Sequence, residues 1–328
     1  MEELDEFCRL GKLFEQSSLA TLREKISNVS TTGLISKDAY NQHPFLHSIC
    51  ENRHVTLEMV ECILYSFPGV AALKRNNDMS YALHCACYSD CPNEVIQFLV
   101  EQYPLALEHL SNGWIDHDEY KVTGLPLHYY LRWNDNINDE TVKMMVEAYP
   151  QSLMFASEEG EGAPCYPLHA LLSNDTFAHP DCESYLCDII TCILEMEPSS
   201  LRVVDGYNKT PLHIVFKINY MFYDDTAAFN LLFNAWPEAI SMRDISGALP
   251  IHFLCSYCTS IELCNNDHYD DDDDALMKIL HVMLDKVPTL LMERDNSGYI
   301  PLHYAIDVKS IDFCKVLIDA FPEAVKIR

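Results

Sequence analysis

Residues 243–252 read RDISGALPIH, and residues 294–303 read RDNSGYIPLH. Both stretches place an Asp, a Gly three residues later and a Pro-Ile-His or Pro-Leu-His tripeptide at the same spacing. The Asp and the Gly are typical of a turn, because the carboxylate accepts local hydrogen bonds and glycine tolerates a positive φ. Residues 205–208, Asp-Gly-Tyr-Asn, are a variant of the same turn. The two matching stretches therefore indicate an internal structural repeat.

The Leu-His or Ile-His pair at the end of these stretches recurs along the whole chain. It occurs seven times, at Leu46-His47, Leu83-His84, Leu127-His128, Leu168-His169, Leu212-His213, Ile251-His252 and Leu302-His303. Self-similarity of this kind is typical of proteins built from stacked repeats.

A proline forms a second landmark, which alternates strictly with the histidines. The seven prolines are Pro68, Pro104, Pro150, Pro198, Pro237, Pro288 and Pro322. Residues eight, five and four positions before each of them are apolar, which places those side chains on one stripe of an α-helix. The proline then ends the helix, because it restricts the preceding residue and has no N–H to donate. Fifteen residues separate Pro288 from His303 and nineteen separate His303 from Pro322, so the unit is about 34 residues, enough for two short helices and a turn.

This unit resembles the ankyrin repeat, with residues 244–252 and 295–303 as the closest matches and Thr210-Pro211-Leu212-His213 as the family's full four-residue tag. An aromatic or apolar residue or Glu, followed by Pro, stands where the family usually has Gly-Ala. The resemblance implies an all-α fold, an α-solenoid of about seven ankyrin-like helix-turn-helix repeats over residues 38–328. The repeats fall roughly at 38–73, 74–110, 111–156, 157–203, 204–242, 243–293 and 294–328. It also implies that the seven motif histidines bond neighbouring backbone and tie each repeat to the next.

Several segments lie outside the regular unit. Residues 1–37 are predicted to form an N-terminal helical cap, because Leu19, Leu22 and Ile26 share one helix face. Insertions are expected at about 109–123, 154–164, 173–187, 217–226 and 256–274. The first carries Trp114 and Tyr120 among acidic residues, and we predict that these two aromatic residues bind a partner. A tolerated surface loop is the alternative.

Composition restricts the class of protein. The chain has 22 Lys and Arg against 50 Asp and Glu, a net charge of −28, which disfavours binding to nucleic acid or to anionic membranes. The acidic N-terminus and the lack of a long apolar run predict a cytoplasmic protein, with the nucleus as the alternative. The 14 cysteines are expected to be reduced. Cys50, Cys87 and Cys255 follow motif histidines by one helical turn and are predicted core residues.

The sequence favours no enzyme, cofactor or metal. The motif histidines recur without a partnered nucleophile, and no phosphate-binding or hydrolase motif occurs. One alternative is zinc at His252, Cys255, Cys258, Cys264 and His268, whose spacing is similar to that of zinc ligands. His252 and Cys255 already have repeat roles, which disfavours it. Asp270 to Asp274 are interpreted as a solvated acidic run.

These observations predict a non-enzymatic scaffold that binds a protein partner, of basic character, through the concave face of the repeats. The alternative is a regulatory or targeting fragment of a larger protein whose effector part lies beyond residue 328. That alternative arises because no polar repeat follows to cover Leu317 and Ile318.

Overall fold

The computed structural model describes residues 45–52, 54–75, 78–111, 114–115, 121–159, 163–174, 176, 183–219, 226–257 and 273–326. The chain divides into two compact units, Met1–Pro167 and Leu168–Arg328. We call them unit 1 and unit 2. The predicted N-terminal cap, residues 1–37, lies outside the described residues.

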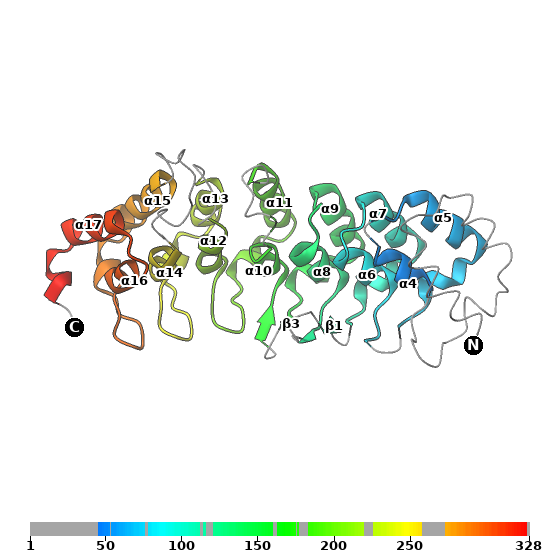
Figure 1. Cartoon of the computed structure of the whole chain (residues 1–328), viewed down its shortest axis with the longest axis horizontal. Helices are drawn as coiled ribbons and strands as arrows, with labels where there is room; N and C mark the ends of the chain where they lie inside the picture. Colours follow the sequence, from blue (N-terminus) through cyan, green and yellow to red (C-terminus); the bar gives the residue numbers. More distant parts are fainter. Residues whose placement is uncertain are drawn as a thin grey trace. The chain divides into compact units, whose positions relative to one another are not determined.

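Unit 1 is built from pairs of α-helices in two rows (Figure 1). The first helix of each pair belongs to one row: α4 (Phe45–Cys50), α6 (Ala82–Tyr88) and α8 (Pro126–Trp133). The second helix belongs to the other: α5 (Leu57–Ser66), α7 (Asn93–Gln102) and α9 (Asp139–Ala148). Helix α6 packs between α4 and α8, and α7 packs between α5 and α9, so each pair covers the next.

Unit 2 repeats this arrangement. Its first helices are α10 (Pro167–Leu171), which begins at the unit boundary, α12 (Pro211–Asn219), α14 (Pro250–Tyr257) and α16 (Pro301–Asp307). Its second helices are α11 (Glu183–Met196), α13 (Ala227–Ala235), α15 (Asp273–Lys286) and α17 (Ile311–Ala320). Helix α14 contacts α12 and α16, and α11 contacts α13. The predicted all-α class is confirmed.

Each landmark proline ends a second helix, as predicted, and also begins a 3₁₀-helix that the sequence analysis did not foresee. These are η1 (Pro68–Ala72), η2 (Pro104–Glu108), η3 (Pro150–Met154), η6 (Pro198–Arg202), η7 (Pro237–Ser241), η9 (Pro288–Met292) and η10 (Pro322–Lys326). The residue before the proline takes part in the backbone hydrogen bonds of both helices. The Tyr103 N–H donates to the Leu99 carbonyl at 3.0 Å, and the Tyr103 carbonyl accepts from the Ala106 N–H at 3.1 Å.

The apolar stripe predicted from the prolines lies in the core. All but four of its positions are buried, and the other four, Leu194, Leu284, Cys314 and Ile318, are half-buried. Cys50, Cys87 and Cys255 are fully buried, which confirms them as core residues. Burial of such stripes between neighbouring pairs supplies most of the apolar stabilisation of a repeat protein.

The loop between a 3₁₀-helix and the next first helix is called a finger below. Two fingers contain short antiparallel hairpins, in the insertions at 109–123 and 154–164: β1 (Trp114–Ile115) with β2 (Lys121–Val122), and β3 (Ser157–Glu159) with β4 (Ala163–Cys165). The insertions at 173–187 and 256–274 lead into α11 and α15, which have 14 residues each. Part of each of these insertions therefore lengthens a second helix, and α15 takes up the last two residues of the acidic run.

Candidate functional site

Six of the seven motif histidines reach the backbone of the finger that leads to the next helix pair. In each case Nε2–H donates to a main-chain carbonyl: His47 to Ser80 at 2.9 Å, His84 to His109 at 2.9 Å, His128 to Phe155 at 3.0 Å, His169 to Lys209 at 3.0 Å, His213 to Ala248 at 3.4 Å and His252 to Glu293 at 3.2 Å. The predicted bonds from these histidines to neighbouring backbone are confirmed for these six. By the repeat bounds given above, the acceptor lies in the next repeat for His47, His169 and His213. For His84, His128 and His252 it lies at the end of the same repeat.

The ring of a motif histidine is held on its other side too. The backbone N–H three residues earlier donates to Nδ1 in His84 at 3.1 Å, and in His213, His252 and His303 at 3.0 Å. A carbonyl only accepts and an N–H only donates, so His84, His213 and His252 are neutral with the hydrogen on Nε2. Burial lowers the pKa of His84 to about 3 and those of His128, His169 and His213 to about 4.

These contacts bear on the zinc alternative. His252 uses its Nδ1 lone pair and its Nε2 hydrogen within the repeat framework, so neither nitrogen is available to a metal. Cys258, Cys264 and His268 lie outside the described residues, and the zinc prediction stays open. Across the part of the chain that the structure describes, no three His, Cys, Asp or Glu side chains are placed to hold a metal ion.

The fingers of unit 2 are organised by the predicted aspartates. The Oδ1 atom of each accepts two backbone N–H bonds from its own turn at 2.7–2.9 Å, in Asp205 from Tyr207 and Lys209, in Asp244 from Ser246 and Ala248, and in Asp295 from Ser297 and Tyr299. Gly247 and Gly298 have φ values of 77° and 86°, as the turn requires, and Asn208 takes this place in the variant turn with φ 58°. The predicted turn chemistry is confirmed.

Neighbouring fingers of unit 2 are also bonded to one another. The Ile245 N–H donates to the Tyr207 carbonyl at 2.9 Å, and the Asn296 N–H donates to the Ser246 carbonyl at 2.8 Å. Arg243 adds a bond from Nη1 to the Arg294 carbonyl at 2.8 Å. Hydrogen bonds therefore join three consecutive fingers into one platform, and the tips of the fingers lie on it.

Aromatic side chains lie across this platform and the first helices behind it. We call Tyr207, Phe253, Tyr299 and Tyr304 the aromatic row. Phe253 and Tyr304 each follow a motif histidine on α14 and α16 and meet the histidine of the preceding repeat edge to face, with ring centroids 5.4 Å apart for His213 and Phe253 and 5.3 Å apart for His252 and Tyr304. Tyr299 approaches Tyr304 at 6.4 Å. The histidines thus hold Phe253 and Tyr304 in place.

The cation within the aromatic row is Lys209. Its Nζ lies 4.9 Å from the centroid of Phe253 and 5.6 Å from that of Tyr207. Such cation–π contacts fix an ammonium group against ring faces while leaving N–H donors open to an incoming acceptor. Lys209 therefore combines a structural contact with a polar binding group.

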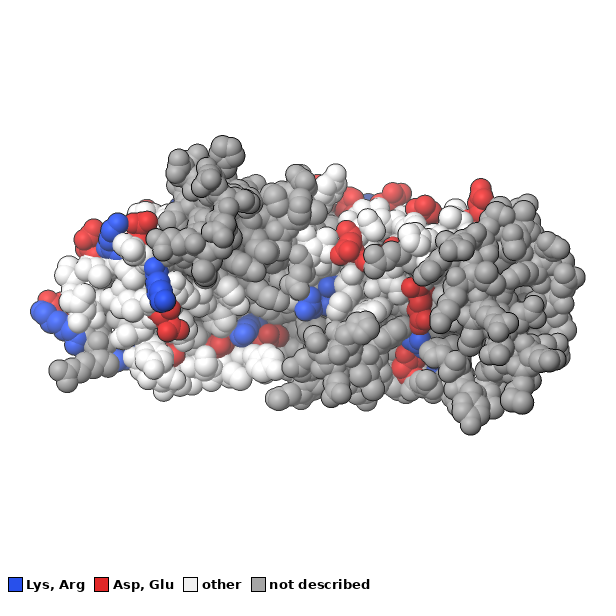
Figure 2. Space-filling model, in the orientation of Figure 1, with Lys and Arg blue, Asp and Glu red and all other residues white. Residues whose placement is uncertain are grey.

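The aromatic row is partly open to solvent. Tyr207 and Tyr299 are exposed, Phe253 and Tyr304 are half-buried, and Ile245 at the adjacent finger tip is exposed. Figure 2 shows a mostly uncharged surface around α14, α16 and their fingers. The Tyr304 hydroxyl donates to Asp295 Oδ2 at 2.7 Å. Burial, followed by this bond to a carboxylate, raises the pKa of Tyr304, so the phenol stays neutral.

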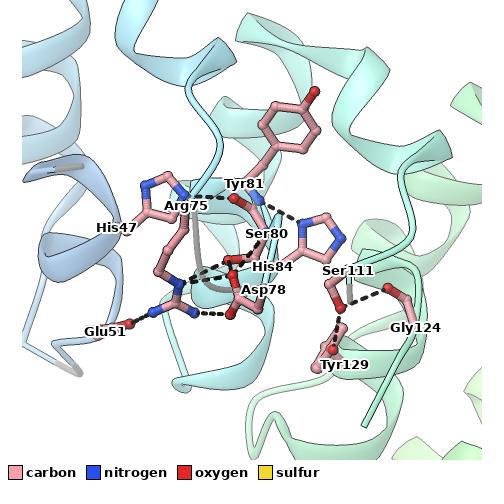
Figure 3. A network of polar contacts seen from close by, with 10 residues as sticks. All are labelled: His47, Glu51, Arg75, Asp78, Ser80, Tyr81, His84, Ser111, Gly124 and Tyr129. Carbon is pink, nitrogen blue, oxygen red and sulfur yellow. Dashed lines mark hydrogen bonds and ion pairs between the residues drawn. The ribbon is translucent and has the colours of Figure 1, made fainter. Parts of the chain in front are cut away.

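A buried ion cluster joins the first two repeats of unit 1 (Figure 3). Arg75, only 3 % exposed, pairs with Glu51 at 2.6 Å and with Asp78 at 2.7 Å. Asp78 Oδ1 also accepts from the Ser80 N–H at 3.0 Å and the Ser80 hydroxyl at 2.8 Å. Burial alone would raise the pKa of Asp78, but the bonds from Arg75 and Ser80 outweigh it and lower the pKa. Because His47 donates to the Ser80 carbonyl, this cluster and the histidine contact fix the same finger.

The second helices of unit 1 carry an acidic edge. We use this name for the exposed carboxylates Glu58, Glu94, Glu101, Glu140 and Glu147. Among the described residues of α5, α7 and α9, only Lys143 brings an opposite charge. Figure 2 shows the acidic side chains along this edge. Such an edge attracts basic groups from solution.

The structure brings together residues that the sequence analysis did not single out. Trp114 lies in β1 opposite Val122, but its side chain and the whole of Tyr120 lie outside the described residues, so their predicted partner role stays a prediction.

The aromatic row was missed because its members occupy variable positions of the repeat. The available signal was Phe253 and Tyr304, each directly after a motif histidine.

The sequence matches no family model, and no curated protein is significantly similar to it. None of the helices in the described ranges combines the length and apolar character that crossing a membrane requires.

Proposed function

We propose that the protein is a non-enzymatic scaffold, an ankyrin-like α-solenoid of about seven helix pairs that binds a protein partner. The observation that carries this proposal is the aromatic row, which lies on hydrogen-bonded fingers and on the first helices behind them and exposes Tyr207 and Tyr299 to solvent. Exposed tyrosines and an exposed isoleucine on a rigid support are the composition of a protein-binding hot spot. The rings of His84, His213 and His252 are occupied by backbone contacts on both sides, which supports a structural rather than catalytic role for them.

The partner we propose is a protein with a basic segment. The net charge of −28 and the acidic edge of unit 1 would accelerate association with it and would repel nucleic acid and anionic lipid. We further propose a cytoplasmic or nuclear location, because the cysteines of the described ranges are free thiols, which suits a reducing compartment.

Selection of random extended peptides on the full chain tests this function. We expect one enriched peptide family whose affinity falls at least about tenfold with the double variant Ile245→Asp, Tyr299→Ala, because a tenfold change corresponds to about 1.4 kcal/mol, within the range of one hot-spot residue. Tyr185→Ala is the matched control, since Tyr185 is an exposed tyrosine of the same unit on α11.

Salt dependence separates the charge component from the aromatic one. Affinity for a basic peptide should weaken as ionic strength rises, because exposed charges are screened. Enrichment of no peptide, or equal affinity for wild type and the double variant, contradicts the proposed site. Affinity that ignores salt contradicts the basic partner but not the aromatic row.

A further inference from the structure

The ammonium group of Lys209 is held within the aromatic row without an acceptor for its hydrogens. Lys209 is half-buried, and its Nζ lies 4.9 Å from the ring centroid of Phe253 and 5.6 Å from that of Tyr207. Among the described residues, no oxygen or nitrogen is placed to accept a hydrogen bond or to form an ion pair with this Nζ. The two rings therefore fix a positive charge and leave its N–H donors open.

The backbone of Lys209 is fixed at both of its polar groups. Its N–H donates to Asp205 Oδ1 at 2.7 Å. Its carbonyl accepts from the Asp205 N–H at 3.0 Å and from His169 Nε2–H at 3.0 Å. Because hydrogen bonds hold the main chain and ring contacts hold the ammonium group, binding of an anion would restrict Lys209 by less than it restricts an ordinary surface lysine. The side chain is thus pre-organised for an anionic group.

The charges around Lys209 limit the kind of anion that fits. Asp205 lies within electrostatic reach of both Lys209 and Asp244, so two carboxylates are close to the ammonium group. They would repel a dianionic phosphate, whose recognition usually requires a cluster of arginines. Arg243 does not provide such a cluster, because its guanidinium donates to two finger carbonyls and pairs with Glu293. A single carboxylate balances the single ammonium charge.

The finger backbone bears on where that carboxylate comes from. Proteins capture the carboxylate of a chain end with clusters of free main-chain N–H groups. At the tip of the Lys209 finger, the N–H groups of Tyr207 and Lys209 donate to Asp205 Oδ1, and the Asn208 N–H donates to the Asp205 carbonyl. These N–H groups form no such cluster, which favours the side chain of an Asp or Glu over a chain end.

We infer that the aromatic row binds a partner segment through an Asp or Glu side chain, whose carboxylate accepts from the ammonium group of Lys209. Apolar side chains of the same segment pack on Tyr207 and Tyr299, which are exposed beside it. This inference rests on the function proposed above and specifies the residue type bound at that site. The acidic residue is confined to Lys209, so the basic residues expected of the partner interact with the negative charge carried elsewhere on the chain.

Two random libraries of extended peptides test this inference on the full chain, one with Glu and one with Gln fixed at the central position. We expect the Glu library to be enriched over the Gln library by about fivefold or more, because a charge-assisted hydrogen bond is stronger than a neutral one. Equal enrichment of both libraries, abolished by the double variant Ile245→Asp, Tyr299→Ala, would overturn the inference and leave the proposed function standing. Enrichment of neither library would contradict both.

Variants of Lys209 assign the preference to this side chain. Lys209→Met should remove the preference for Glu, since methionine keeps an apolar contact with the rings but has no N–H donor. Lys209→Arg should retain it. Lys286→Met, at an exposed lysine of α15 in the same unit, is the matched control and should leave it unchanged. Equal thermal midpoints of the variants would show that the finger is intact, and a preference that persists in Lys209→Met would overturn the inference.

Resynthesised peptides separate the possible sources of the anion. The selected Glu peptide should bind equally well with a free and with an amidated C-terminus. Loss of binding on amidation would overturn the inference by assigning the site to a chain end. Phosphoserine in place of Glu should weaken binding, because of the carboxylates of Asp205 and Asp244. Binding that tightens by about tenfold or more would instead assign the site to phosphate and overturn the inference as well.

Discussion

The Nε2 atom of His84 lies 2.9 Å from the carbonyl oxygen of His109, while Nδ1 of His84 lies 3.1 Å from the N–H of Tyr81. One buried ring therefore joins its own helix start to the finger that leads to the next helix pair. The arrangement requires the neutral imidazole, because a second ring hydrogen would point at the Tyr81 N–H. Repeat stacking is thus linked to protonation.

The first prediction concerns pH. The pKa of His84 is lowered to about 3 and those of His128, His169 and His213 to about 4, against about 6.5 in an unfolded chain. Between these values the unfolded state binds more protons, so the free energy of unfolding falls as pH falls from about 6.5 towards 4. Each histidine contributes up to about 2 kcal/mol to the loss at about pH 5. Urea unfolding at about pH 7.5 and pH 5 measures this loss in the free energy of unfolding.

His169→Gln serves as the control for this pH effect, because it removes one titrating group and keeps an N–H donor. The variant should lose less stability than wild type between the two pH values. An equal free energy of unfolding of the wild-type protein at both pH values would show that protonation of these rings does not control the stability of the stacked repeats.

The second prediction concerns the buried ion cluster. Arg75→Met should lower the free energy of unfolding by about 3–5 kcal/mol, because it leaves the carboxylates of Glu51 and Asp78 without their cation in a buried site. Lys143→Met, at an exposed lysine of α9, should change stability by no more than about 0.5 kcal/mol. Chemical unfolding of both variants measures this difference. Similar losses in the free energy of unfolding for Arg75→Met and Lys143→Met would refute a special role for the cluster.

The third prediction uses three glycines with different surroundings. Gly247→Ala should cost about 2–3 kcal/mol, because φ is +77° and the new Cβ would come within 2.5 Å of Asn296 Oδ1. Gly298→Ala has a similar φ of +86° but meets only Arg294 Nη1 at 3.7 Å, so it should cost about 1–2 kcal/mol. Gly69→Ala meets nothing within 4 Å and should be neutral or slightly stabilising. Thermal unfolding ranks them, and a reversed order of the first two would contradict the finger contact.

The fourth prediction concerns thiol reactivity in unit 1. Burial raises the pKa of Cys85 and Cys87, and a hydrogen bond with Cys91 followed by burial raises that of Cys50. These thiols should react with an alkylating reagent only when the unit unfolds, whereas half-buried Cys62 should react in the native protein. Mass spectrometry of alkylated peptides over time measures the order, and early labelling of Cys87 would contradict a closed core.

The features predicted from the sequence are those that the copies share. The stripe before each proline, the turn at Asp244 and the contact of His252 with the following finger recur in register, so each copy supports the others. Features present once receive no such support. Arg75 meets Glu51 only because the finger folds back on the end of α4, a contact over 24 residues that no local pattern encodes. The 3₁₀-helices were missed for a different reason, since proline was considered only as the end of a helix and not as the start of the next.

The junction at each landmark proline also bears on how freely the chain can bend. The 328 residues include 10 glycines and 16 prolines, so reversals of direction rely on a residue whose φ is already fixed. Proline restricts the unfolded chain and thereby reduces the conformational entropy that folding removes. A corner built this way is stiff, and flexing between its two helices would have to break the shared contacts of Tyr103 or its equivalents. Any elasticity of the molecule should therefore reside away from these corners.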